Sequence, residues 1–261
     1  MRIAPFFIWL ISILLFSIAS VFLPFYRKFF YILIAGHLPI LAAGIRNIRL
    51  QFFGKVFIHI KKKSNHIALT FDDGPDPNLT PDILNILKKH TMKATFFIIS
   101  ARAEQYPDMV KQCFNEGHII ACHDLTHSVF SNFRTSEPLL RDLNKSRDII
   151  QSIMGKKPSL YRPPMGLTNP HVPGILKKLN MYCIGWSKSA GDAGNRRLVK
   201  INKISTLAGA GEVILLHDTL PNPEYKQEIL SQIDKLCTSI KLKKLEPVGI
   251  DEMFDIQAYE S

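Results

Sequence analysis

The chain has 261 residues, 46% of them hydrophobic, and a formal net charge of +11 at pH 7. Its basic residues are scattered and accompany no aromatic-basic reader motif, so a nucleic-acid-binding protein is not predicted. We interpret them as membrane-flanking charges and solvated faces, with an anionic surface or wall polymer as the expected neighbour. The four cysteines form no C-x-x-C pair, which argues against a zinc knuckle or a redox motif.

The N-terminus is strongly apolar. Residues 3–25 are almost all apolar, and a run of about 20 such residues can cross a bilayer. The run is too long for a signal-peptide core and lacks a clear cleavage site, so an uncleaved membrane anchor is predicted. A second apolar stretch, residues 29–45, is interpreted as a second span, a re-entrant segment or an interfacial helix.

The number of spans decides the predicted topology. One span would place the following domain outside the cytoplasm, which we favour for a membrane-anchored protein. Two spans would return the domain to the cytoplasmic side, in agreement with the basic residues Arg46, Arg49 and Lys55. The predicted organisation is a membrane-anchor region at 1–45, a connecting strand and basic turn at 46–64, and one large domain at 65–255.

Apolar runs alternate with amphipathic runs through that domain. Strands are predicted at 51–60, 66–69, 95–99, 119–122, 160–161, 181–186, 213–216 and 245–248. Helices are predicted between them at 80–90, 107–115, 137–154, 172–179, 198–207 and 224–236. This alternation predicts an α/β fold of parallel strands with helices outside, either a barrel or an open doubly wound sheet.

Two adjacent carboxylates, Asp72 and Asp73, follow the strand at 66–69, where Gly74 and Pro75 turn the chain. Like charges this close repel, so a cation or a proton must neutralise one of them. A metal on one carboxylate, with the other free as a base, would do so. These residues alone equally fit a plain turn that uses Asp and Gly for their backbone freedom.

His123 and His127 are four residues apart, so one helical turn would place both imidazoles on one face. With Asp73 they form a two-histidine, one-carboxylate set that suits zinc or another divalent first-row metal. Such a pair alone is more often surface or capping histidines. A metalloprotease would need His-Glu-x-x-His, and here Asp124 stands in the second position.

Five short motifs occur in order along the chain: Thr-Phe-Asp-Asp-Gly-Pro at 70–75, His-x-x-x-His at 123–127, Arg-Pro-Pro-Met-Gly at 162–166, Asp192, and Leu-Leu-His-Asp at 215–218. In this order they resemble the polysaccharide deacetylase family, which includes chitin, chitooligosaccharide and peptidoglycan N-acetylglucosamine deacetylases. The resemblance runs from about residue 66 to about residue 248 and leaves the apolar N-terminus outside.

The resemblance implies a distorted (β/α) barrel of mostly parallel strands and metal-dependent hydrolysis of an amide. It implies that Asp73, His123 and His127 bind one divalent ion, most simply Zn²⁺, with Co²⁺ or another first-row metal as alternatives. The ion would bind a water and the acetamido carbonyl, so that the water becomes more acidic and the carbon more electrophilic.

The same resemblance implies roles for four further side chains. Asp72 would be the general base, kept ionised by the metal and by Arg162. His217 would be the general acid that protonates the leaving amine, and Asp192 would orient His217 and hold it charged. A backbone N–H near Met165 would stabilise the tetrahedral oxyanion.

Three positions depart from the family pattern. Asp124 replaces the usual Ser or Thr and is expected either to support a metal ligand or to cap a turn. Met165 replaces the common Tyr, and Ala193 replaces the usual Trp, which removes one expected wall of the sugar pocket. Trp186 and Tyr161 could each provide an aromatic surface for a sugar or belong to the core.

The predicted function is removal of N-acetyl groups from the amino sugars of a cell-wall or related glycan. One alternative is deacetylation or deformylation of a lipid-linked amino sugar, for which an N-terminus at the bilayer would be suited. Another is a membrane-tethered glycan-binding protein without catalysis, which the retained Asp72, Asp73 and His217 argue against. The predicted partners are the glycan and the membrane, with neither nucleic acid nor an obligate protein partner.

Overall fold

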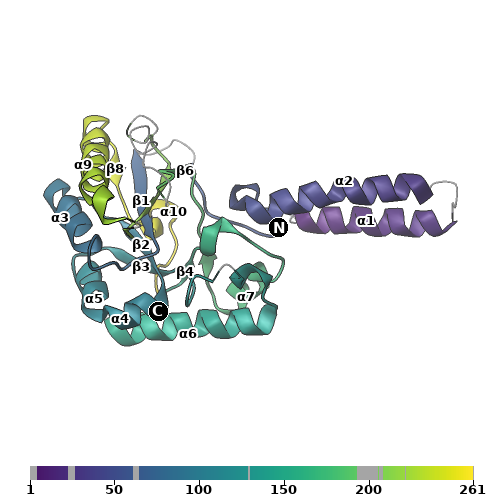
Figure 1. The fold of residues 1–261 in the computed structure, drawn as a ribbon, viewed down its shortest axis with the longest axis horizontal. Coiled ribbons are helices and arrows are strands. Elements are labelled where there is room, and N and C mark those ends of the chain that lie inside the picture. Colours follow the sequence, from purple (N-terminus) through teal and green to yellow (C-terminus); the bar gives the residue numbers. More distant parts are fainter. Residues whose placement is uncertain are drawn as a thin grey trace.

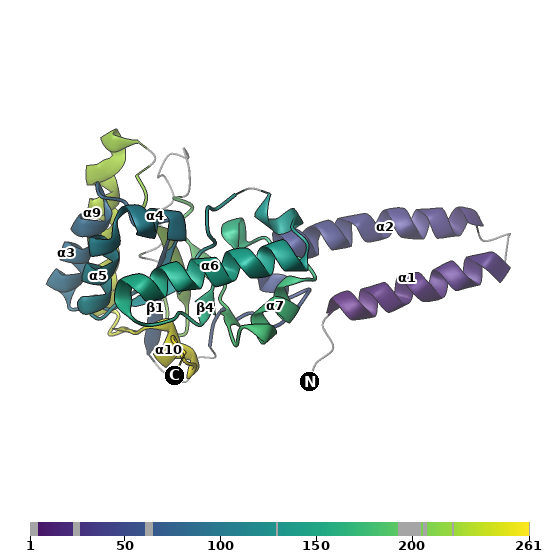
Figure 2. The same ribbon diagram turned by 90° about the horizontal axis from the view of Figure 1, so that it is seen from below.

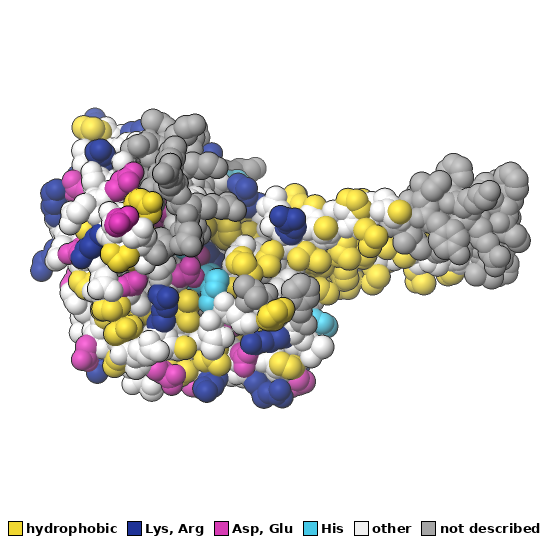
Figure 3. All heavy atoms as spheres, in the orientation of Figure 1, with side chains coloured by type: hydrophobic (Ala, Val, Ile, Leu, Met, Phe, Trp, Pro, Cys, Tyr) yellow, Lys and Arg dark blue, Asp and Glu magenta, His cyan; other side chains and the backbone are white. Residues whose placement is uncertain are grey.

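The computed structural model describes residues 5–22, 27–60, 65–128, 130–192, 205, 208–220 and 222–260. It has two parts, an N-terminal helical hairpin and the α/β barrel that follows it (Figure 1). The hairpin consists of α1 (Pro5–Phe22) and α2 (Arg27–Arg46), which lie side by side and extend away from the barrel (Figure 2). The described part of its surface is mostly apolar, whereas the barrel surface is mixed (Figure 3).

The hairpin was predicted to contain a membrane-spanning anchor. Among the residues that the structure describes, however, no helix combines the length and the apolar character needed to cross a membrane. The predicted transmembrane segment is therefore not supported by the described residues.

The base of the hairpin is fixed to the barrel. The Phe6 amide donates a hydrogen bond to the Phe52 carbonyl at 2.8 Å, and the rings of Phe6 and Phe53 are 5.0 Å apart. Phe52, Phe53 and Ile48 are buried. The residues that join the hairpin to the barrel are therefore part of the folded core, not a loose linker.

The barrel is built on parallel strands. They are β1 (His66–Asp72), β2 (Thr95–Ile98), β3 (Ile119–Cys122), β4 (Leu160–Tyr161), β5 (Tyr182–Cys183), β6 (Lys188–Ser189), β7 (Val213–His217) and β8 (Glu246–Pro247). Their order is β5-β4-β3-β2-β1-β7-β6, with β8 beside the start of β1, and each of these pairings is parallel. The predicted parallel α/β fold is confirmed, in the form of a half-barrel.

A short segment before β1 forms single bridges with residues next to β5 and next to β7. Phe57 forms a parallel bridge with Ile184, just after β5, and His59 forms an antiparallel bridge with Glu212, just before β7. The peripheral strand predicted at 51–60 is thus wrong as a continuous strand.

Helices cover the outside of the sheet (Figure 1). They are α3 (Thr80–His90), α4 (Ser100–Gln105), α5 (Pro107–Asn115), α6 (Ser136–Met154), α7 (Val172–Lys178) and α9 (Lys226–Leu242). A further helix, α10 (Ile250–Phe254), packs instead with the side chains that face the barrel interior. Short 3-10 turns lie at Ile48–Leu50, Ser131–Phe133, Pro164–Gly166 and Pro223–Tyr225. The first four helices predicted after residue 65 are confirmed to within one residue at each end. The helix predicted at 198–207 lies, except for Ser205, outside the described residues.

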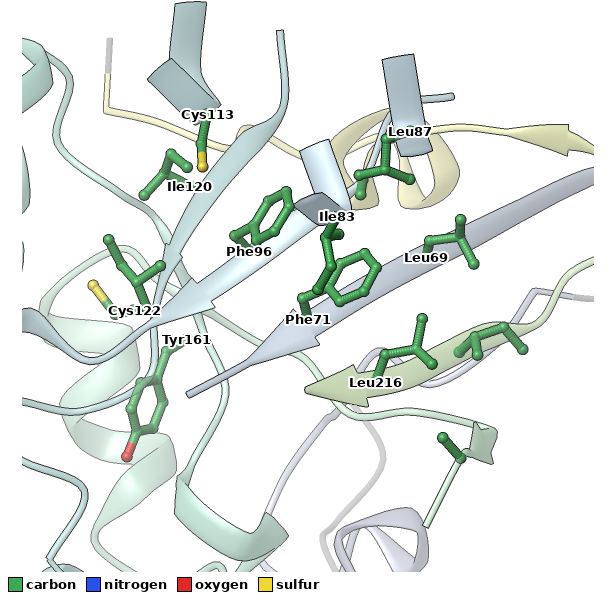
Figure 4. Packing of buried hydrophobic residues seen from close by; sticks show 14 of the residues in the cluster. Leu69, Phe71, Ile83, Leu87, Phe96, Cys113, Ile120, Cys122, Tyr161 and Leu216 are labelled. Atoms are coloured by element: carbon green, nitrogen blue, oxygen red, sulfur yellow. The ribbon is translucent and has the colours of Figure 1, made fainter. Parts of the chain in front are cut away.

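Strand alternation decides which side chains reach the barrel interior. Leu69 and Phe71 of β1 point into the layer between sheet and helices, where Phe71 stacks on Phe96 with ring centroids 5.1 Å apart (Figure 4). Since neighbouring strand residues face opposite sides, Thr70 and Asp72 point the other way, into the barrel. The apolar packing of β1 therefore sets the direction of the carboxylate at its end.

Candidate active site

Polar side chains gather where the parallel strands end. Asp72 is the last residue of β1 and His217 the last residue of β7, while His123 and Arg162 directly follow β3 and β4. The carboxyl ends of neighbouring parallel strands meet at one edge of a barrel, and Asp72 and His217 are register partners. The structure thus brings residues from four distant parts of the sequence to one place.

Asp72, His123 and His217 face a cleft of about 590 Å³. The described residues that line it are Arg46, Asp72, Asp73, His123, His127, Met165, Gly166, Leu167, Trp186, Ser189, Gly191, Leu215 and His217. Of the residues predicted from sequence to form the site, Arg162 and Asp192 are the two that do not line the cleft. Each lies behind it and is bonded to a residue that does.

Asp73, His123 and His127 converge on one point. Their ligand atoms all lie within 4.8 Å of one another, and the Nε2 atoms of both histidines lie 3.3 Å from Asp73 Oδ1. Asp73 and His127 reach these positions with left-handed backbones, at φ 75° and 55°. The predicted two-histidine, one-carboxylate set is therefore preassembled by the turns after β1 and β3.

The hydrogen bonding of His123 shows what this set needs. Its Nδ1 lies 2.8 Å from the carbonyl of Arg162, and because a carbonyl only accepts, Nδ1 carries the proton. In the neutral ring Nε2 then presents a lone pair to Asp73 Oδ1, which is buried and has no hydrogen-bond partner among the described residues. Two hydrogen-bond acceptors that face one another in this way fit a cation between them. One carboxylate oxygen and two imidazole nitrogens are ligands that suit a divalent first-row metal.

The three side chains of this set shift one another's pKa values. Burial alone would raise the pKa of Asp73, but His123 and His127 outweigh it and lower the value to about 2. Burial would likewise lower the pKa of His123, whereas Asp72 and Asp73 outweigh burial and raise it. Burial and the adjacent His123 lower the pKa of His127. The carboxylate is thus held ionised, which is the form that a metal ligand requires.

Asp72 is held from behind by Arg162. The guanidinium is fully buried; its Nη1 donates to Asp72 Oδ1 at 2.6 Å and to Thr70 Oγ1 at 2.8 Å, and its Nη2 donates to the Gly185 carbonyl at 2.9 Å. Its plane also packs 4.0 Å from the ring centroid of Phe97. One carboxylate oxygen of Asp72 is therefore fixed, while Oδ2, 3.7 Å from His123 Nε2, faces the site.

His217 and Asp192 form a separate pair on the other side of the cleft. His217 Nδ1 donates to Asp192 Oδ1 at 2.8 Å, and the backbone amide of His217 donates to Asp192 Oδ2 at 3.0 Å. Burial alone would lower the pKa of His217, but Asp192 outweighs it and raises the pKa to about 9. The pair therefore keeps His217 protonated at neutral pH and leaves its Nε2 free of Asp192.

The three residues that depart from the family pattern have different places in the structure. Asp124 is buried and accepts a hydrogen bond from Ser131 Oγ at 2.6 Å, so it holds the turn after β3 and does not bond to a metal-set histidine. Met165 is 48% exposed at the rim of the cleft, with φ 56°. Ala193 lies outside the described residues.

The structure also distinguishes the two aromatic residues that could contact a sugar. Trp186 lines the cleft and packs against Gly166, where an added Cβ would lie 2.3 Å from the indole Cη2. Tyr161 is buried in the core (Figure 4). Of the two, Trp186 provides the aromatic wall.

Asp218 was quoted only as part of a motif, yet it fixes the turn that carries Asp73. It is fully buried, accepts a hydrogen bond from Thr80 Oγ1 at 2.8 Å, and donates its backbone amide to the Asp72 carbonyl at 3.1 Å. A Cβ on Gly74 would lie 2.0 Å from its Oδ2, so only glycine fits there. Burial raises the pKa of Asp218 to about 7.

The sequence model of a family described as polysaccharide deacetylase matches residues 59–184. A peptidoglycan-N-acetylglucosamine deacetylase of Bacillus cereus is 31% identical over 207 residues, which cover 78% of this chain and 95% of the relative. The chain belongs to the polysaccharide deacetylase family. The resemblance found from the motifs is confirmed.

Two further comparisons describe how far the likeness extends. The Listeria monocytogenes peptidoglycan-N-acetylglucosamine deacetylase PgdA is 32% identical over 195 residues, which cover 74% of this chain but only 40% of that relative. The crystal structure of the Bc1960 peptidoglycan N-acetylglucosamine deacetylase superposes with a TM-score of 0.71 at 30% identity and covers 78% of this chain and 94% of that one. The likeness is therefore to the barrel.

Proposed function

We propose that this chain is a metal-dependent hydrolase that removes acetyl groups from N-acetylated amino sugars of a cell-wall glycan, with N-acetylglucosamine of peptidoglycan as the expected substrate. The observation that carries the proposal is the convergence of both imidazole Nε2 atoms on Asp73 Oδ1 in a cleft that Asp72 and His217 also line. The relatives named above, which are deacetylases of peptidoglycan, support the choice of substrate.

Asp73, His123 and His127 would hold one divalent ion, with Zn²⁺ or Co²⁺ as the expected metal. When bound, the ion supplies Lewis acidity toward a water and toward the acetamido carbonyl. The Arg162 carbonyl contributes by holding the proton of His123 on Nδ1, so that Nε2 is the ligand atom.

Asp72 takes the proton of the attacking water. Arg162 occupies Oδ1, which leaves Oδ2 on the cleft side as the atom that accepts the proton. The fully buried guanidinium restricts the rotation of this carboxylate. Arg162 is thus a positioning residue that acts through Asp72.

His217 protonates the leaving amine. As the water oxygen bonds to the carbonyl carbon and the C–N bond breaks, the proton moves from His217 Nε2 to the sugar nitrogen, giving acetate and a free amine. Asp192 keeps the other ring nitrogen occupied and the imidazolium charged. We assign the oxyanion contact to the Met165 amide, because the next two amides, of Gly166 and Leu167, donate within the turn.

We place the barrel outside the cytoplasm as part of the same proposal, because that is where a cell-wall glycan is accessible. Protease added to intact cells should then digest the barrel. Digestion only after the cells are opened would contradict this location without affecting the proposed reaction.

Acetate release by the purified full chain tests the function. A truncated barrel is unsuitable because Ile48, Phe52 and Phe53 are part of the core. The substrates are peptidoglycan fragments and N-acetylated chitooligosaccharides, each with zinc, with cobalt and with chelator. Release that depends on metal is expected. One bound metal without release would favour a lipid-linked or formylated amino sugar, and neither metal nor release would favour the glycan-binding alternative.

A further inference from the structure

Arg46 connects the helical hairpin to the catalytic cleft. It is the last residue of α2 and lies before the residues that match the family model, yet it lines the cleft together with Asp72, Asp73 and His217. Among the described residues that line the cleft, it is the one with a permanent positive charge. The family-wide chemistry does not account for a cation in this place.

The residues around Arg46 are held in place from two sides. The Ile45 carbonyl accepts a hydrogen bond from the Thr168 amide at 3.1 Å, next to the turn that forms one wall of the cleft. Arg49 Nη1 donates to the Ser187 carbonyl at 3.3 Å, next to Trp186 in the other wall. Ile48, between them, is buried in the core. The backbone at Arg46 is thus fixed relative to both walls.

The guanidinium of Arg46 is available for a ligand. It is exposed, and within the described part of the chain it forms no hydrogen bond or ion pair. Of the two acids in the cleft, Asp72 is paired with Arg162, and Asp73 belongs to the proposed metal set with the two histidines. A helix C-terminus favours any cation, which explains a basic residue at this position but not its lack of a partner inside a cleft.

We propose that Arg46 binds a negatively charged group of the glycan next to the sugar that is deacetylated, so that the enzyme prefers an acidic substrate to a neutral one. This inference rests on the proposed function and deepens it. A guanidinium pairs with a carboxylate or a phosphate through two parallel N–H···O bonds. A carboxylate is present where the glycan carries acidic substituents, and a phosphate where the sugar is attached to a phosphorylated carrier.

Selectivity between matched substrates tests the proposal with the full chain. The three substrates are neutral chitotetraose, a peptidoglycan tetrasaccharide with free lactyl carboxylates, and chitotetraose 1-phosphate. Arg46→Ala should lower kcat/KM for one acidic substrate, relative to chitotetraose, by about tenfold, the equivalent of one charge-assisted bond. Loss confined to the lactyl substrate identifies a carboxylate ligand, and loss confined to the phosphorylated substrate identifies a phosphate ligand.

Arg141→Ala is the matched control, since it removes an equal charge from an exposed side chain of α6 that does not line the cleft. It should leave the selectivity ratio unchanged, and Arg46→Lys should retain part of it. An unchanged ratio in Arg46→Ala, or an equal change in Arg141→Ala, would overturn the proposal.

Calorimetry on the chelator-treated protein measures glycan binding without catalysis, so it tests the role of Arg46 independently of the proposed reaction. Wild-type protein should bind one acidic glycan more tightly than chitotetraose, and Arg46→Ala should remove that difference of about tenfold. If the wild type releases no acetate from any substrate, the proposed function fails while this measurement still decides the role of Arg46.

Discussion

The two halves of the active site differ in how their charges are balanced. In the metal half, Asp73 Oδ1 lies 3.3 Å from two imidazole Nε2 atoms without a hydrogen bond. With the proton of His123 on Nδ1, this arrangement fits a cation between the three groups. In the acid half, the His217 N–H meets the Asp192 carboxylate at 2.8 Å, so donor and acceptor are already complementary. The metal half therefore lacks a compensating charge, whereas the acid half is a complete hydrogen-bonded pair.

This difference predicts different responses to change. Removing ligands from the metal half should abolish binding of an ion, whereas altering the acid half should move a proton equilibrium and leave the ion in place. The cleft walls, which carry no reacting group, should respond least.

The largest effect is expected from the double substitution His123→Ala with His127→Ala. It removes two of three ligands, so stoichiometric metal binding should be lost and acetate release should fall by at least about a thousandfold. Metal content is measured on the purified protein, with Asp192→Asn as the control that retains it. One ion per chain in the double variant would contradict the ligand assignment.

Asp72→Asn should keep the metal and lose most turnover. An amide cannot accept the proton of the water, so kcat should fall by about 10²–10⁴-fold. The substitution also leaves the Arg162 charge without its carboxylate, and removing one partner of a buried pair costs about 3–5 kcal/mol of stability. The unfolding midpoint and the metal content are therefore measured together with kcat. Near-normal turnover in a folded variant would show that Asp72 is not the base.

The pH dependence isolates the acid half. The pKa of His217, about 9, lies above that of a free histidine, so its charged form is present below about 9 and is lost as the pH rises through that value. The stability that the His217–Asp192 pair contributes is fully present below about 6.5, the ordinary pKa of histidine, and is lost as the pH rises from there through about 9. The basic limb of the wild-type pH–rate profile should accordingly lie near 9.

Asp192→Asn should move this limb down toward 6.5 and lower kcat at pH 8 by roughly thirtyfold, because it removes the group that raises the pKa of His217. The metal content should not change. A basic limb that stays near 9 in this variant would exclude His217 as the acid that Asp192 controls.

The same contrast shows what the sequence could predict. The residue types of the metal half were readable from Asp73, His123 and His127, since their motifs follow strands whose apolar runs are plain. The sequence could not show which ring nitrogen of His123 would bind a metal, because that depends on a hydrogen bond from His123 to the Arg162 carbonyl, 39 residues away. Long-range contacts of this kind leave no local pattern.

Residues outside the motifs were harder to interpret. Arg46 was assigned only to membrane topology, because its place in the cleft follows from packing of the hairpin base against the barrel. Trp186 and Tyr161 were equivalent in sequence, and burial alone separates them. The strand predicted at 51–60 had a suitable composition, but its neighbours offered single bridges and not a ladder.

The smallest effect is expected at the aromatic wall. In Gly166→Ala the new Cβ would lie 2.3 Å from Trp186 Cη2, so the indole must move. Because Trp186 is predicted to contact the sugar without touching the reacting atoms, KM for the glycan should rise by about threefold to tenfold while metal content stays the same.

Gly155→Ala is the control for backbone strain. Both glycines have left-handed φ angles, +66° at Gly166 and +76° at Gly155, so either alanine should cost about 1–2 kcal/mol of stability. A Cβ at Gly155, however, meets nothing within 4 Å. Both variants should thus unfold at lower temperature, and only Gly166→Ala should raise KM. An equal rise in both variants would mean that strain, not the displaced indole, limits glycan binding, and the aromatic wall would have to be sought elsewhere in the cleft.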